Sequence, residues 1–266
     1  NPLASFVFFG AFFWRVFWRT RPGPSMSERS DIPPVPASRE PVSLLAVDRA
    51  VSELRRGRAV ALAGAGGRAA LCLAAEAVTP EALSELEQRA RARAVLAITG
   101  RRAKVLGLCD GDSRVVTLTA ARFAAGTVHD LADPLSGVQA RALNLAIGEP
   151  APFGCETAAV VLAKLARLLP AALVAPLADA EVGDLAQWAA RHDLFVLDAG
   201  DVFQYETTAA RTLARVSEAR VPLAGAEDTR IIAFRPLDGG LEHLAIVIGA
   251  PDAAQPVLTR IHSECF

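Results

Sequence analysis

The sequence predicts an α+β fold: a layered sheet domain, followed by the first strands of a second domain. Between residues 42 and 208, segments with helical spacing of apolar residues alternate with short apolar runs typical of buried strands. From residue 209 onward, short apolar runs are instead separated by turn signals, as in hairpin-connected strands. An apolar fraction of 52% in 266 residues is enough to fill a core.

The first predicted helix is "SLLAVDRAVSELRRGR", residues 43–58. Four apolar residues recur close to helical spacing, and Gly57 marks the helix end. These four residues are Leu45, Val47, Val51 and Leu54. The next stretch, "AVALAG", predicts a short buried strand. The glycine cluster "GAGG" at residues 64–67 lacks the lysine of a phosphate-binding loop, so we interpret it as a tight turn between strand and helix.

A cap signal opens the second predicted helix, "TPEALSELEQRARA", residues 79–92. Thr79 suits the cap position, and Pro80 suits the first helical position. Glu81 and Glu85 place negative charge in the opening turns, which favours a helix start. The following run, "AVLAITG", predicts a second buried strand.

The same alternation continues toward the second domain. "CETAAVVLAKLARLLP" predicts a helix stopped by Pro170, and "AALVAPLA" predicts a strand. "EVGDLAQWAARHD" predicts another helix, and "LFVLDAGDVFQYE" another strand. "RIIAFRPLDGGLEHLAIVIG", residues 230–249, predicts a β-hairpin with its turn at Asp238, Gly239 and Gly240.

Charge and cysteine usage exclude some functions and leave others open. The formal net charge is −1, with no basic stripe that would track a nucleic-acid backbone, so we expect no nucleic-acid partner. The four cysteines form no CxxC pair and predict neither a disulfide framework nor a complete zinc site. We therefore expect a reducing, cytoplasmic location.

The first 41 residues differ from the rest, and we expect them to be a disordered or non-native extension. The opening 25 residues hold half of the chain's aromatic side chains. Arg15 interrupts their apolar run, which is shorter than the roughly 20 residues that span a bilayer, so we expect no membrane anchor. Met26 is the only methionine and is followed by a polar, proline-rich stretch. We expect translation to start at Met26.

The order of these segments resembles a fused pair of riboflavin-biosynthesis enzymes. Residues 42–208 resemble 3,4-dihydroxy-2-butanone 4-phosphate synthase, whose "AAEKVTPE" and "AAVDLARLA" are similar to "AAEAVTPE" and "AAVVLAKLA" here. The resemblance implies the synthase type of layered α/β sandwich. Residues 209–266 resemble the opening of GTP cyclohydrolase II, a second α+β domain.

The resemblance to the synthase fails at the residues that carry its chemistry. The family's acidic loop, similar to "DDEDRENEGD", is replaced by "AGAGGRAALC" at residues 63–72, which has no carboxylate. Cys155 and Thr157 stand where the family's "GHTEA" has histidine and glutamate, and Pro176 replaces a later glutamate. Magnesium prefers oxygen ligands and disfavours thiolate, so we expect a degenerate domain without magnesium. A new nucleophile and base made of Cys155 and Glu156 is the alternative.

The resemblance to the cyclohydrolase is specific at "PVLTRIHSEC", residues 256–265, which is similar to the family's "PVLVRVHSEC". It implies contacts with GTP from Arg260, Ile261, His262, Ser263 and Glu264. It also implies that Cys265 is the first of three zinc ligands. A zinc ion with three protein ligands keeps an open position at which bound water is acidified.

The resemblance implies the N-terminal part of a GTP cyclohydrolase II, which opens the imidazole ring of GTP and releases formate and pyrophosphate. We expect the chain to be truncated inside that domain and inactive alone, because the other zinc ligands and the proton acceptor would follow Phe266. We also expect a homodimer. Two alternatives remain: a working synthase acting on ribulose 5-phosphate, and a non-catalytic dimerisation or regulatory module.

Overall fold

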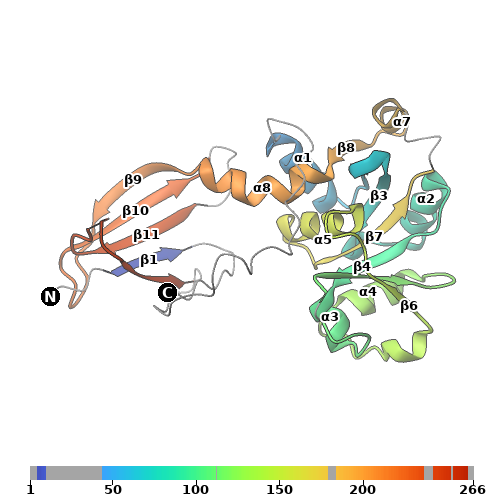
Figure 1. Ribbon diagram of the computed structural model, residues 1–266, viewed down its shortest axis with the longest axis horizontal. Coiled ribbons are helices and arrows are strands. Elements are labelled where there is room, and N and C mark those ends of the chain that lie inside the picture. Colours follow the sequence, from blue (N-terminus) through green and yellow to red (C-terminus); the bar gives the residue numbers. More distant parts are fainter. Residues whose placement is uncertain are drawn as a thin grey trace, which may run out of the picture. The chain divides into compact units, whose positions relative to one another are not determined.

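The computed structural model describes residues 5–9, 44–111, 113–178, 184–236, 242–252 and 254–262. Its contacts divide the chain into two compact units (Figure 1). The larger unit is Pro34–Tyr205, and the smaller one combines Glu206–Phe266 with Asn1–Pro33. The expected domain limits, 42–208 and 209–266, remain predictions.

A seven-stranded mixed sheet forms the centre of the larger unit. Its order across the sheet is β6-β5-β4-β7-β3-β2-β8, and only the β2–β8 pair is parallel. The strands are β2 (Val60–Ala63), β3 (Ala69–Ala74), β4 (Val95–Thr99), β5 (Val115–Thr119), β6 (Ala146–Gly148), β7 (Ala171–Pro176) and β8 (Phe195–Asp198). A mostly antiparallel sheet covered by helices confirms the predicted α+β class.

Helices cover both faces of this sheet and enclose two apolar cores (Figure 1). One core packs α1 (Leu44–Arg55), α5 (Cys155–Leu165) and the start of α8 (Ala199–Arg211) against the sheet. The opposite core is covered by α2 (Pro80–Ala90), α3 (Gly100–Val105), α4 (Ala125–Ala132) and α7 (Leu185–Arg191). Strand residues alternate between the two cores, as Leu71 and Cys72 on β3 do.

The first two predicted helices are confirmed, with one change. In α1, Val47, Val51 and Leu54 are buried as expected, but Leu45 is 72% exposed and does not belong to the apolar stripe. In α2, the Thr79 side chain accepts a hydrogen bond from the Ala82 amide, and Pro80 is the first helical residue.

Three predictions of local structure are wrong. The glycine cluster at 64–67 lies between two strands, β2 and β3, and not between a strand and a helix. Helix α5 ends at Leu165, before Pro170 is reached. The stretch expected as one strand from Leu194 is a strand only to Asp198 and then becomes α8. The Asp198 carboxylate accepts a hydrogen bond from the Gly200 amide, and Val202 is buried in the core, so local capping and packing favour the helix.

The smaller unit contains a five-stranded sheet in the order β12-β1-β11-β10-β9. Its strands are β1 (Ser5–Phe9), β9 (Ala214–Arg220), β10 (Thr229–Arg235), β11 (His243–Ile248) and β12 (Leu258–His262). Strands β10 and β11 pair antiparallel, which confirms the predicted hairpin. Its turn, with Asp238, Gly239 and Gly240, lies outside the described residues.

Strand β1 belongs to the extension that was expected to be disordered. It pairs antiparallel with β11 and parallel with β12. The expectation of a disordered or non-native extension over residues 1–41 remains a prediction. Residues 10–41, including Met26, lie outside the described part of the chain, and the predicted start of translation remains a prediction. Among the described residues, no helix is long and apolar enough to cross a membrane.

Candidate functional site

The predicted GTP-binding motif begins on β12, an outer strand of the smaller sheet. Arg260 and His262 lie on one face of the strand because successive side chains alternate, and Ile261 lies on the other. Arg260 is exposed, His262 is half-buried and Ile261 is 47% exposed. Arg260 and His262 can therefore reach the same ligand, and Ile261 cannot do so from the same side.

The remainder of the motif cannot be placed. Ser263, Glu264 and Cys265 lie outside the described residues, so their roles with GTP and zinc remain predictions. Within the described part of the chain, no group of three or more His, Cys, Asp or Glu side chains could hold a metal ion.

Cys155, the first residue of α5, is a buried thiol that donates a hydrogen bond to the Leu62 carbonyl over 3.8 Å. Burial raises its pKa to about 12, and the negative charge of Glu156 contributes in the same direction. The thiol is therefore protonated at neutral pH and is a poor nucleophile. This environment disfavours the alternative of a new nucleophile and base at Cys155 and Glu156.

Two further positions, Thr157 and Pro176, make contacts within the fold. The buried Thr157 hydroxyl donates to the Ala151 carbonyl over 2.9 Å. Pro176 is the last residue of β7, where it pairs with Ala70 of β3. Neither side chain carries the negative charge of a carboxylate or the ring nitrogen of an imidazole.

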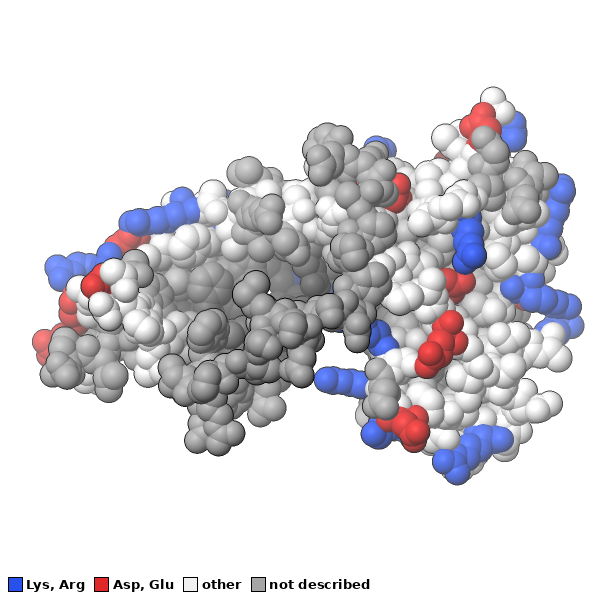
Figure 2. Space-filling model, viewed as in Figure 1, with Lys and Arg blue, Asp and Glu red and all other residues white. Residues whose placement is uncertain are grey.

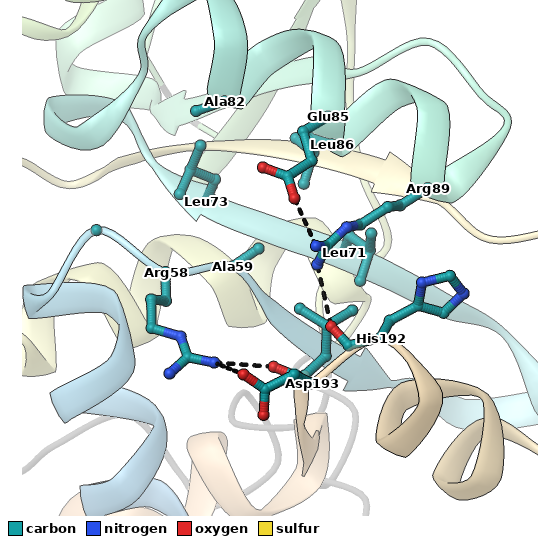
Figure 3. Close-up of a pocket in the computed structure, with 12 residues that line it drawn as sticks. Arg58, Ala59, Leu71, Leu73, Ala82, Glu85, Leu86, Arg89, His192 and Asp193 are labelled. Atoms are coloured by element: carbon teal, nitrogen blue, oxygen red, sulfur yellow. Dashed lines mark hydrogen bonds and ion pairs between the residues drawn. The ribbon is translucent and has the colours of Figure 1, made fainter.

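A separate surface hollow of about 260 Å³ lies beside α2 and the end of α7 (Figure 3). Its floor is apolar and includes Leu71, Leu73 and Leu86. Charged and polar side chains surround this floor: Arg58, Glu85, Arg89, His192 and Asp193.

The two arginines of the hollow bind the chain that leaves α7 (Figure 3). Arg58 donates to the Asp193 carbonyl over 2.9 Å and to its carboxylate over 2.6 Å. Arg89 donates to the His192 carbonyl over 3.2 Å and forms an ion pair with Glu85. We call this arrangement the arginine clamp. Because its charges are already paired, we assign the hollow a structural role.

No local motif predicts the clamp, because Arg58 and Asp193 are 135 residues apart in the chain. On the face shown in Figure 2, Lys and Arg are interspersed with Asp and Glu over the larger unit. That distribution offers no continuous basic surface for a polyanion.

The predicted motif lies within a segment that matches a known protein family. The family model of GTP cyclohydrolase II matches residues 214–266. GTP cyclohydrolase-2 of Azospirillum brasilense is 49% identical over 233 residues, which cover 84% of this chain and 58% of that protein. Riboflavin biosynthesis protein RibBA of Aquifex aeolicus is 26% identical, covering 86% of this chain and 65% of the relative. The chain therefore spans about three fifths of the length of these two relatives.

Solved structures give a weaker similarity. RibBX, a two-domain 3,4-dihydroxy-2-butanone 4-phosphate synthase from A. baumannii, is 20% identical with a TM-score of 0.49, covering 76% of this chain and 70% of that one. The corresponding synthase of Candida albicans has a TM-score of 0.47 and 20% identity, covering 60% of this chain and 96% of that one. The sequence matches, and not these structures, make the chain a relative of GTP cyclohydrolase II and of the RibBA riboflavin biosynthesis proteins.

Proposed function

We propose that the protein to which this chain belongs is a zinc-dependent GTP cyclohydrolase II of riboflavin biosynthesis. The observation that carries the proposal is the family match over residues 214–266, which contains the complete "RIHSEC" motif. The 49% identity to a relative named GTP cyclohydrolase-2 favours this function over a working synthase or a non-catalytic module.

The proposed roles follow from the chemistry of the motif residues. Arg260 would bind the triphosphate of GTP through charge-assisted hydrogen bonds. His262 shares its face of β12 and would contact the same ligand. Ile261, Ser263 and Glu264 complete the proposed GTP contacts, with Ile261 approaching from the other side of the strand.

Cys265 would be one of three thiolate ligands of a zinc ion, which when bound supplies an acidified water as nucleophile. A single thiolate cannot hold zinc in a tetrahedral site, so we propose that residues 1–266 alone do not act on GTP. The homodimer and the cytoplasmic location remain part of the same proposal.

An assay of GTP-dependent formate release tests the proposal in the full-length protein. We expect activity with zinc and a loss of at least about 100-fold in Cys265→Ser, because ligand loss weakens both the metal site and its chemistry. The matched control is Cys109→Ser, a half-buried cysteine of the larger unit that should keep activity. Unchanged formate release in Cys265→Ser would reject the zinc role.

A further inference from the structure

The corner where the synthase-like unit would carry its metal is built from the 63–68 turn and the first turn of α5. We propose that this corner is a closed packing joint that binds no divalent cation, so that the unit supports the fold and performs no synthase chemistry. This inference concerns the larger unit and does not depend on the cyclohydrolase activity proposed above.

The first support is the space between the turn and the helix. A Cβ atom added to Gly64 would lie 2.9 Å from the Cys155 Sγ and 3.4 Å from the Arg68 carbonyl oxygen. The Gly64 amide donates to that same Arg68 carbonyl over 2.7 Å, which closes the turn. The φ of Gly64 is −95°, so glycine is needed here for space and not for backbone conformation. The Cys155 thiol therefore occupies the space beside Gly64 and leaves no room there for a side chain.

The second support is the set of available donors. Magnesium requires an octahedral set of oxygen ligands, usually including carboxylates. The turn contributes no carboxylate. The charges of Glu156, Asp198 and Arg68 all act on the Cys155 thiol, so a positive charge shares the corner with the two carboxylates. Asp198 already accepts a hydrogen bond from the Gly200 amide over 2.8 Å. The described residues therefore do not fit a divalent metal at this corner.

Metal binding can be measured directly with manganese as a paramagnetic substitute for magnesium. The chain is titrated with Mn²⁺ and the free ion is followed by electron paramagnetic resonance, alongside Glu156→Gln and Asp198→Asn. We expect the same free-ion signal for all three proteins. Stoichiometric binding that is lost in either variant would overturn the proposal, since it would place a cation at the corner. Because GTP is absent, this result does not bear on the proposed cyclohydrolase.

The packing joint itself is tested by a double-mutant cycle between Gly64 and Cys155. We expect Gly64→Ala to lower the midpoint of thermal unfolding by several degrees, and the same change in a Cys155→Ala background to have much less effect. If Gly64→Ala alone does not fold, the double variant should recover folded protein. Equal losses in both backgrounds, or no recovery, would show that the two residues do not form a joint.

Discussion

Of the described glycines with a measured added-Cβ contact, Gly100 has the least room for a side chain. A Cβ atom there would lie 1.8 Å from the Ser113 carbonyl oxygen, a backbone atom that cannot move without disturbing β5. The Gly100 amide also donates to the Arg114 carbonyl over 3.1 Å. This glycine therefore lets the start of α3 approach the backbone ahead of β5.

We predict that Gly100→Ala lowers the free energy of unfolding by about 3 kcal/mol, through overpacking against backbone. Gly126 in α4 is a matched control, since nothing lies within 4 Å of an added Cβ. Gly126→Ala should be neutral or stabilising by at most about 0.5 to 1 kcal/mol, because alanine has a higher helix propensity than glycine. Urea unfolding monitored by circular dichroism measures both changes. Equal stability of the two variants would contradict the prediction.

Cys72 predicts a dependence of stability on alkaline pH. Its burial raises the pKa of the thiol from 9.0 to about 12, and a thiolate at Cys155 would act in the same direction. The folded protein therefore retains a proton that the unfolded chain loses above pH 9. Stability from this source is fully present below pH 9 and is lost as the pH rises toward 12.

We predict that this thiol alone removes about 1.4 kcal/mol of unfolding free energy between pH 8 and pH 10. Cys72→Ala should show a correspondingly smaller loss over that range, although it is less stable at pH 8 because of the lost packing. Urea unfolding at the two pH values gives the comparison. If the free energy of unfolding depends on pH in the same way in both proteins, the pKa of the Cys72 thiol is not raised by burial.

Among the helices, α2 shows how a local signal fixes an element. Thr79 caps its first turn by accepting from the Ala82 amide over 3.1 Å, and Pro80 supplies a preset backbone angle at the first helical position. We predict that Thr79→Ala costs about 1 kcal/mol in unfolding free energy. Thr79→Ser keeps the hydroxyl and should cost much less. If Thr79→Ser lowers the unfolding free energy as much as Thr79→Ala does, the loss comes from the missing methyl group and not from the missing cap.

The arginine clamp acts at the end of α7, where Asp193 has a positive φ of 53°. We predict that Arg58→Met raises hydrogen exchange at the amides of Asp193 and Leu194, because the carbonyl and carboxylate contacts that hold this turn are lost. Global stability should fall by less than about 1 kcal/mol, since the ion pair is exposed. Arg56→Met, on the same exposed stretch, is the control. Equal exchange in both variants would contradict a clamp.

The sequence predicts elements that are defined by their own residues. The Thr79 cap and the hairpin of β10 and β11 were found because their signals are local. The helix from Ala199 was predicted as a strand, because its valine, phenylalanine and tyrosine have high strand propensity. In the structure Val202 is buried in the core, and this packing favours the helix over the intrinsic propensity. Strand β3 was not assigned, because a short run of alanine and leucine suits either a strand or a helix.

The same distinction applies to the sites. Arg260 and His262 were proposed as site residues because their motif is contiguous; β12 places both on one face, and their role with GTP remains a prediction. The contact between Gly64 and Cys155 joins residues far apart in sequence, and only the pairing of β2, β3 and α5 brings them together. Contacts between residues that are distant in the chain cannot be predicted from local patterns in a single sequence.

In the molecule as a whole, the two units differ in how much apolar surface they bury. The larger unit contains both main cores, built from residues 47–202. In the smaller unit, the buried residues among those described are Thr229, Pro236, Ala245, Ile246 and Val247. A small sheet with so little buried surface is marginal without further contacts.

We therefore predict that a piece comprising residues 34–211, which keeps α8 intact, unfolds cooperatively with a thermal midpoint within about 5 °C of the whole chain. A piece comprising residues 212–266 should show no cooperative transition, because it lacks β1 and leaves the facing edges of β11 and β12 unpaired. Circular dichroism melting curves and limited proteolysis compare the three chains. Loss of cooperativity in the first piece would show that the larger unit needs the smaller one to fold, whereas a stable second piece would show that its sheet does not require Ser5–Phe9.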